Sequence, residues 1–172
     1  MLVCIWKAKN LFVSGILAFL WLWSGIVYHV LFFTSINDAA YFFGVLFIIQ
    51  GLLFVLAMVK NSLSFAFRKD AYGVLALLFV LYALLVYPFL NYVFGHWWPV
   101  NPTFGLPCPL TIFTFALLLL TDKPIPKYLV IIPLAWSFVG ASAAVFLGII
   151  EDYGLLVVGV LGTFALWWRD KK

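Results

Sequence analysis

Two histidines and one of the two cysteines are the side chains in this 172-residue chain that best suit metal chemistry: His29, His96 and Cys108. Imidazole nitrogens and a thiolate sulfur bind copper and zinc, and both also serve as axial ligands of haem iron. Histidines inside a membrane protein can relay protons as well. These residue types therefore predict a site for a soft metal ion or a haem, if the fold brings the three side chains together.

Three of the six acidic residues, Asp38, Glu151 and Asp152, accompany them on the same side of the predicted membrane spans. A second interpretation competes with the metal site. Asp38 and Asp152 directly precede predicted helices, where a carboxylate caps free N–H groups, and the C-terminal end of a helix favours histidine. No His-x-x-His or Cys-x-x-Cys spacing decides between helix capping and a shared site, so both interpretations stay open.

The elements that hold these residues must be membrane helices. Only 9% of the residues are charged and 67% are hydrophobic, whereas a water-soluble domain carries about 25% charged residues. Closed barrels also cross membranes, but their strands alternate over roughly 10-residue segments. The apolar runs here are continuous and longer. The sequence therefore predicts an all-α, polytopic membrane helix bundle.

Six apolar runs are long enough, or nearly so, to cross a bilayer that needs about 17–25 residues per helix. We expect one membrane domain over residues 1–172, with six transmembrane helices at about 11–33, 40–59, 72–95, 104–121, 128–149 and 153–168. All ten Lys and Arg residues then fall at the two termini and in the second and fourth loops. Because basic residues concentrate on the cytoplasmic side, both termini are predicted to be cytoplasmic. The excess of Lys and Arg over Asp and Glu thus reflects membrane topology and contact with anionic lipid. No nucleic-acid partner is expected.

The stretch from His96 to Thr114 contains four prolines and a glycine, and it includes Pro107-Cys108-Pro109. One interpretation is a re-entrant or broken segment before the fourth span, tolerated only against protein or water. The other is a proline-initiated helix in which Thr111 and Thr114 bond to their own helix. Since each proline disfavours helix in the residue before it, we expect Cys108 to be extended, with the positive helix end lowering the pKa of its thiol.

Polar residues near the middle of the spans need hydrogen-bond partners. Gln50 lies centrally in the second span and Trp21 and Trp23 in the first, so their side chains are expected to face protein, as glue between helices or along a solute path. The small residues Gly140, Ala144 and Gly148 recur at every fourth position. That spacing predicts a packing face, used within the chain, for self-association or against another membrane subunit.

Three stretches resemble a bacterial integral membrane family known as domain-of-unknown-function family 6064. They are Trp21-Leu22-Trp23-Ser24-Gly25 with Tyr28-His29 and Asn37; Gly95-His96 with Pro102-Thr103-Phe104-Gly105 and Pro107-Cys108-Pro109; and Ile132-Pro133, Trp136, Gly140 and Asp152. The resemblance implies a multi-pass protein of the bacterial inner membrane and names no mechanism. Family members tend to have more hydrophobic sequence before the first span than the ten residues found here.

Two functions from different classes follow from these patterns. The first is small-solute or metal handling through an outward-facing His/Cys site. The second is an accessory subunit that packs against a larger membrane complex and has no chemistry of its own. An enzyme ranks last, because the sequence contains no nucleophile–base motif and no phosphate-binding loop.

Overall fold

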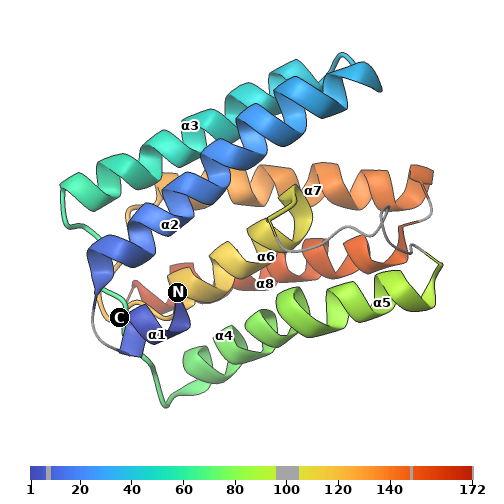
Figure 1. The fold of residues 1–172 in the computed structure, drawn as a ribbon. Helices are drawn as coiled ribbons and strands as arrows, with labels where there is room; N and C mark the ends of the chain where they lie inside the picture. The colour runs from blue at the N-terminus through green and yellow to red at the C-terminus, as the bar shows by residue number, and fades with distance from the viewer. Residues whose placement is uncertain (7–8, 96–104, 148, 172) are drawn as a thin grey trace. The chain divides into compact units, whose positions relative to one another are not determined.

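Helices make up the regular structure that the computed structural model describes, over residues 1–6, 9–95, 105–147 and 149–171, apart from isolated β-bridge residues such as the pair Phe65 and Thr121 (Figure 1). The elements are α1 (Leu2–Trp6), α2 (Asn10–Trp23), the π-helix η1 (Ser24–Phe32), η2 (Phe33–Ser35), α3 (Ala40–Val59), α4 (Ala71–Leu81), the π-helix η3 (Tyr82–Val86), α5 (Tyr87–Val93), α6 (Pro107–Leu119), α7 (Tyr128–Leu147), η4 (Ile150–Asp152) and α8 (Tyr153–Arg169). The predicted all-α class is confirmed for these residues.

Three helical segments are long and apolar enough to cross a membrane: Asn10–Ser35, Ala40–Val59 and Ala71–Val93. Three shorter apolar segments follow: Pro107–Leu119, the Tyr128–Ser142 part of α7, and Tyr153–Arg169. Each lies within or close to a predicted span. Six crossings with both termini in the cytoplasm remain a prediction.

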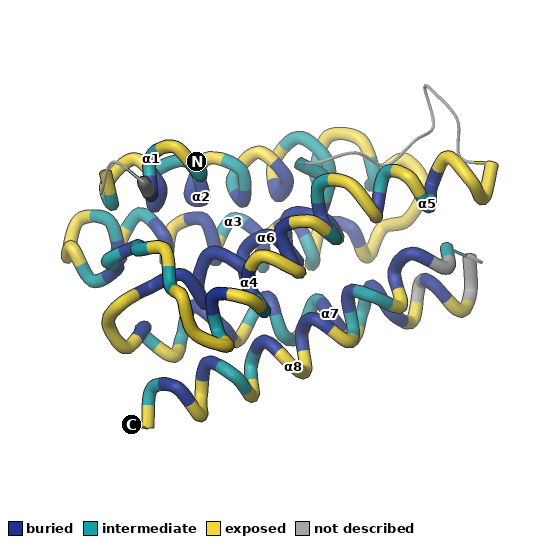
Figure 2. The backbone as a smooth tube through the Cα atoms, turned by 90° about the horizontal axis from the view of Figure 1, so that it is seen from below, coloured by how far each residue is buried: buried dark blue, intermediate teal, exposed yellow. Residues whose placement is uncertain are grey.

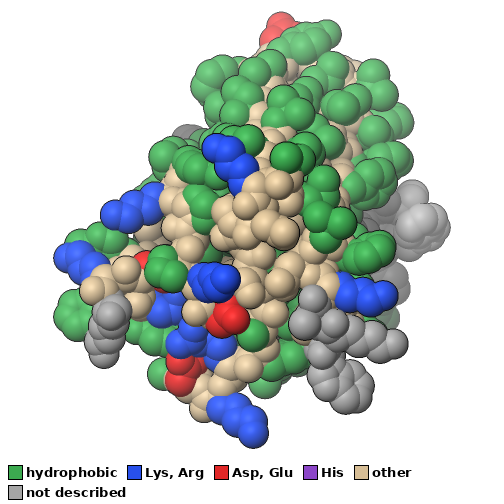
Figure 3. Space-filling view, turned by 90° about the vertical axis from the view of Figure 1, so that its left-hand side faces the viewer, with side chains coloured by type: hydrophobic (Ala, Val, Ile, Leu, Met, Phe, Trp, Pro, Cys, Tyr) green, Lys and Arg blue, Asp and Glu red, His purple; other side chains and the backbone are tan. Residues whose placement is uncertain are grey.

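The surface supports a lipid environment. Hydrophobic side chains cover much of the face drawn in Figure 3, and large ones such as Phe42, Leu85 and Ile131 are more than 60% exposed. Contiguous apolar surface on this scale marks a membrane or an interaction surface rather than contact with water. Within each of the two compact units into which the chain divides, this surface encloses a separate set of buried polar groups.

Unit 1 comprises residues 1–67 and 121–132, and α2 and η1 pack against α3 in it. The helices approach closely at Gly25, where an added Cβ would lie 2.9 Å from the carbonyl oxygen of Gly44. Trp21 is fully buried, with its ring centroid 4.5 Å from that of Phe47, as expected. The same expectation is wrong for Trp23, which is 49% exposed because it lies two residues away from Trp21, on another face of the helix.

The buried Gln50 acts as glue between helices, as one of the two interpretations predicted. Its Nε2 donates a hydrogen bond of 3.1 Å to the carbonyl oxygen of Leu129 in α7. This carbonyl lies four residues before Pro133, which is inside the same helix and has no N–H to donate to it. The glutamine amide therefore replaces a hydrogen bond that the proline removes.

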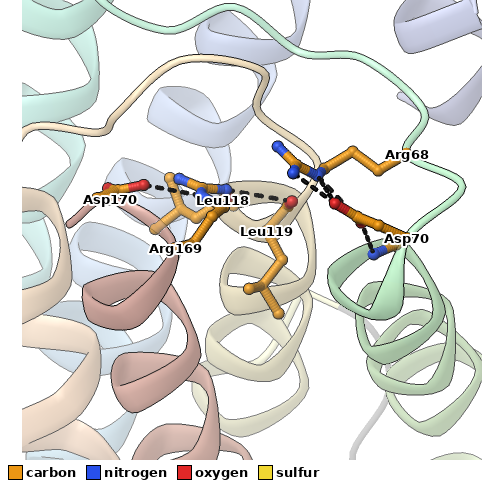
Figure 4. A network of polar contacts seen from close by, with 7 residues as sticks. Arg68, Asp70, Leu118, Leu119, Arg169 and Asp170 are labelled. Atoms are coloured by element: carbon orange, nitrogen blue, oxygen red, sulfur yellow. Dashed lines mark hydrogen bonds and ion pairs between the residues drawn. The ribbon is translucent and has the colours of Figure 1, made fainter. Parts of the chain in front are cut away.

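Unit 2 comprises residues 68–120 and 133–172. In it α6 packs against α4 and α8, and almost every residue of α6 is buried (Figure 2). At the C-terminal end of α6, Arg169 donates from Nη1 to the carbonyl oxygens of Leu118 (2.9 Å) and Leu119 (3.2 Å) (Figure 4). A guanidinium at this position satisfies terminal carbonyls and complements the negative end of the helix dipole.

The start of α4 lies in the same polar network of unit 2. The side chain of Asp70 caps α4 by accepting a 3.1 Å hydrogen bond from the Gly73 N–H, and it forms an ion pair with Arg68 (Figure 4). The hydrogen bonds and charge of the Arg68 guanidinium hold the pKa of Asp70 at about 2. Arg68 and Arg169 thus lie together (Figure 4), and Arg169 ends the helix α8 that begins after η4, which carries Glu151 and Asp152.

Candidate functional site

Four side chains from four elements of unit 2 meet in what we call the Asp152 cluster: Tyr87, Cys108, Trp136 and Asp152. The Tyr87 hydroxyl donates a 2.7 Å hydrogen bond to Asp152 Oδ1. The Cys108 thiol interacts with the side chains of Asp152, Trp136 and Tyr87. A carboxyl, a thiol and a phenol that can each carry or lose a proton are therefore directly connected.

The π-helix η3 brings two tyrosines onto one face. Tyr82 and Tyr87 are five residues apart, a spacing that points side chains in different directions in an α-helix but makes them neighbours where hydrogen bonds run from i to i+5. Their ring centroids lie 6.4 Å apart, and the Tyr82 hydroxyl donates a 2.8 Å hydrogen bond to the Glu151 carbonyl oxygen. The wide turn immediately precedes Pro88, whose missing N–H breaks the regular helical ladder.

Cys108 lies in the first turn of α6, which begins at Pro107 after an extended Leu106. The expectation that Cys108 would be extended is therefore wrong. The first N–H groups of a helix have no partner within it, so Pro107 and Pro109 remove no hydrogen bond there. The proline-initiated helix is confirmed: Thr111 and Thr114 donate from Oγ1 to the carbonyls four residues earlier, both at 2.8 Å. Any re-entrant segment before Gly105 falls outside the described residues.

Helix α7 packs closely against the Cys108 thiol at Gly140. A Cβ added at Gly140 would lie 3.5 Å from Cys108 Sγ and would overlap the Leu155 side chain of α8. Gly140 thus packs within the chain, as one of the predicted uses of the small-residue face requires. Ala144 is also buried, Gly148 lies outside the described residues, and contact of this face with another subunit stays a prediction.

The acidic pair in η4 is deeply buried, with Glu151 0% and Asp152 3% exposed. Asp152 occupies the N-cap position of α8, but its carboxylate makes no capping hydrogen bond; it accepts from the Tyr87 hydroxyl instead and interacts with the Cys108 thiol. Burial raises the pKa of Asp152 to about 6; the Tyr87 and Cys108 hydrogen bonds act in the opposite direction, and the charge of Glu151 adds to the increase. The predicted side-chain cap is therefore wrong for Asp152.

The capping prediction also fails for Asp38. The N-cap of α3 is Ala39, and the nearby side-chain hydrogen bond is accepted by Asn37 Oδ1 from the Ala39 N–H, at 2.9 Å. Asparagine closes a local turn of this kind as readily as aspartate does. Asp38 is left exposed to solvent.

Of the two histidines, the structure describes one, and it lies in unit 1. His29 lies in η1 of unit 1, fully buried, with Nδ1 2.9 Å from the Ser24 carbonyl oxygen and its ring centroid 4.5 Å from that of Phe47. His96 lies outside the described residues. Within the described part of the chain, no three His, Cys, Asp or Glu side chains form a group that could hold a metal ion. A metal or haem site at His29, His96 and Cys108 stays a prediction.

Residues 3–172 match the model of a protein family described as "Family of unknown function (DUF6064)". The chain belongs to the DUF6064 family. No curated protein and no solved structure matches it. The function of this DUF6064 chain must therefore be argued from its own side chains.

Sequence reasoning missed the two tyrosines of the DUF6064 chain that complete the site. Tyr82 and Tyr87 lie in an apolar span, where tyrosine is ordinarily taken as an interface residue. The one local hint in the sequence is Pro88, which directly follows Tyr87 and interrupts the regular helical hydrogen bonds. Trp136 entered the sequence analysis only through the family resemblance, although its side chain interacts with the thiol of Cys108.

Proposed function

We propose that this DUF6064 chain is a multi-pass membrane protein that handles a small cationic solute at the Asp152 cluster. The observation that carries the proposal is the convergence of Tyr87, Cys108 and Asp152 from three separate elements at one buried point. Ionisable side chains are costly in a membrane environment, and a connected group of them marks a solute or ion site.

The chemistry of the cluster favours a cation. Asp152 and Glu151 are carboxylic acids, and no Lys, Arg or His is among the described groups that influence the pKa of Asp152. Tyr87 and Trp136 present aromatic rings, whose faces attract cations. The Cys108 sulfur adds affinity for soft metal ions such as Cu(I), Zn(II) or Cd(II).

We further propose that the chain crosses the bacterial inner membrane six times with cytoplasmic termini, so that this cluster would lie on the outer side. The support is the distribution of basic residues, because Arg169 lies at the other end of α8 from Asp152. The cluster would then receive its solute from outside the cell.

Protection of Cys108 from alkylation tests the proposal. The protein in lipid nanodiscs is treated with N-ethylmaleimide in the presence of Cd(II), Zn(II) or methylammonium, and modification of Cys108 and Cys4 is followed by mass spectrometry. We expect at least one of these cations to slow modification of Cys108 about tenfold or more at saturation, while Cys4 reacts unchanged.

Two variants separate binding at the cluster from general shielding. Asp152→Asn should abolish the protection, because it removes the charge that attracts the cation. Asp38→Asn removes an exposed acid and should leave the protection intact. If none of the three cations protects Cys108, or if protection survives in Asp152→Asn, the proposed solute site is wrong.

A further inference from the structure

The charged residues of unit 1 are divided between its two ends. Asp38 precedes α3, whereas the other acid of this unit, Asp122, lies in the segment before α7. The lysines that the structure describes in unit 1 occupy that segment and the segments where α2 begins and α3 ends. We call them the lysine platform: Lys9, Lys60, Lys123 and Lys127. Together with Asp122 they carry a net charge of +3.

Backbone contacts join the three segments that carry the lysine platform. Phe65 forms a β-bridge with Thr121, and the Phe65 N–H donates a 2.8 Å hydrogen bond to Asn10 Oδ1 at the start of α2. The Asp122 N–H donates another, of 3.0 Å, to the Ser64 carbonyl oxygen. Phe65 and Thr121 are both buried, which anchors the segments in the core of the unit. The lysines therefore extend from one connected surface rather than from independent loops.

The charges of the lysine platform are not neutralised within the part of the chain that the structure describes. All four lysines are exposed, and none of them forms an ion pair with a described carboxylate. The arginines of unit 2 differ, because Arg68 is paired with Asp70 and Arg169 with Asp170. Four like charges held on one surface without acidic partners attract an external anion. The lysine platform is therefore complementary to an anionic ligand.

Exposed apolar side chains adjoin the lysines on both α2 and α3. Val59 directly precedes Lys60 and is 74% exposed, and Phe12 is more than half exposed, with Lys9 Nζ 5.4 Å from its ring centroid. A lysine at the edge of an apolar surface lays its methylene stem along that surface and keeps its ammonium group in the polar layer. A phospholipid offers acyl chains to the apolar side chains and a phosphate to the lysines, whereas a free phosphate would use the lysines alone.

We infer that the lysine platform binds anionic phospholipid, with the headgroup phosphate on the lysines and the acyl chains along the exposed apolar side chains of α2 and α3. A basic residue beside a membrane helix strengthens the attraction to anionic lipid about fivefold. Lipid bound here would hold the start of α2 and the end of α3 at the level of the headgroups. The inference is independent of the solute site proposed in unit 2, so that either can fail without the other.

Native mass spectrometry of the full chain in a nonionic detergent tests the inference. The protein receives equimolar dioleoylphosphatidylglycerol, which is anionic, and dioleoylphosphatidylcholine, which has the same acyl chains and no net charge. We expect the protein to retain the anionic lipid in preference, and this preference should fall about twentyfold in Lys60→Gln/Lys123→Gln. Both positions are exposed, so the variant should fold normally. Lys60→Arg/Lys123→Arg keeps both charges and should keep the preference.

A matched variant and a competitor show what the lipid recognises. Lys69→Gln/Lys171→Gln removes two positive charges from unit 2 and should leave the preference unchanged. Glycerol phosphate carries a phosphate without acyl chains and should not displace the lipid when added in large excess. Equal retention of the two lipids, a preference that survives in Lys60→Gln/Lys123→Gln, or an equal loss in Lys69→Gln/Lys171→Gln would overturn the inference. Displacement by glycerol phosphate would also overturn it, because the platform would then bind anions without contacting lipid chains.

Discussion

The two units of this protein bury polar side chains in different ways. In unit 1, Gln50 donates to the backbone carbonyl of Leu129, and the His29 ring nitrogen lies against the backbone carbonyl of Ser24. In unit 2, the Tyr87 hydroxyl donates to the Asp152 carboxylate, and the Cys108 thiol interacts with the same carboxylate. A backbone carbonyl cannot change its charge, whereas a carboxyl beside a phenol and a thiol can. Polar groups of the first kind fix the positions of helices, and those of the second kind can respond to a proton or a solute.

The close helix contact of unit 1 gives the largest expected effect on stability. A methyl group at Gly25 would meet backbone atoms of α3, Gly44 O and Ile48 N, both at 2.9 Å, and backbone cannot move aside cheaply. We expect Gly25→Ala to lower the free energy of unfolding by about 1–3 kcal/mol. Reversible unfolding in mixed micelles, followed by circular dichroism, measures it.

Gly15→Ala is the matched control in the same span. Its Cβ would have only the flexible Met58 sulfur as a neighbour, at 3.4 Å. Alanine also favours helix over glycine by about 0.5–1 kcal/mol, so this variant should be neutral or slightly more stable. Equal losses in the two variants would show that the helices of unit 1 are not held at the distance described.

A double-mutant cycle tests whether Gln50 is a structural replacement for a lost helical hydrogen bond. Gln50→Leu leaves the buried Leu129 carbonyl without its donor, which should cost about 1–2 kcal/mol. In a Pro133→Ala background, residue 133 regains an N–H that can donate to this carbonyl, so the same substitution should cost much less. The micelle unfolding assay gives all four stabilities. An unchanged cost in the Pro133→Ala background would mean that Gln50 has a role other than satisfying the carbonyl.

The smallest expected effect concerns Asp70, which lies away from both sets of buried polar groups. Asp70→Asn keeps an N-cap residue but loses the ion pair with Arg68, and an exposed pair of this kind contributes about 0.5 kcal/mol. Because folding lowers the pKa of Asp70 to about 2, its contribution is present above about pH 4 and is lost as the pH falls toward 2. Thermal unfolding of both proteins across this range should show their difference vanish in acid. A difference that persists at pH 2 would assign the effect to helix capping rather than to charge.

The arrangement of helices was largely readable from composition and run length. The predicted span 40–59 coincides with α3, and the predicted proline-initiated start of the fourth helix agrees with α6. A long apolar run must be surrounded by lipid or protein wherever it lies in the fold, so its position can be predicted from the local sequence alone. Cys108 and Asp152 were likewise singled out by their types.

The contacts of the site could not be read in the same way. Asp152 directly precedes a predicted helix, and this position predicted that its side chain would cap the helix. The direction of the carboxylate depends instead on partners distant in sequence, here Tyr87 and Cys108. The π-helix that aligns Tyr82 with Tyr87 leaves no periodic signal, because one extra residue per turn does not alter an entirely apolar run. The proposed link between His29 and Cys108 required knowledge of how distant helices pack, which spacing does not contain.

The length of α6 has a consequence for how the protein tolerates different membranes. Its 13 residues extend about 20 Å, less than the roughly 30 Å of a hydrocarbon core, whereas the 20 residues of α3 match that thickness. Nearly all of α6 is buried, so its length need not match the lipid. Hydrophobic mismatch in a thicker or thinner bilayer would therefore act first on helices such as α3, which expose large apolar side chains along their length. The start of α6, which holds Cys108, is insulated from that stress.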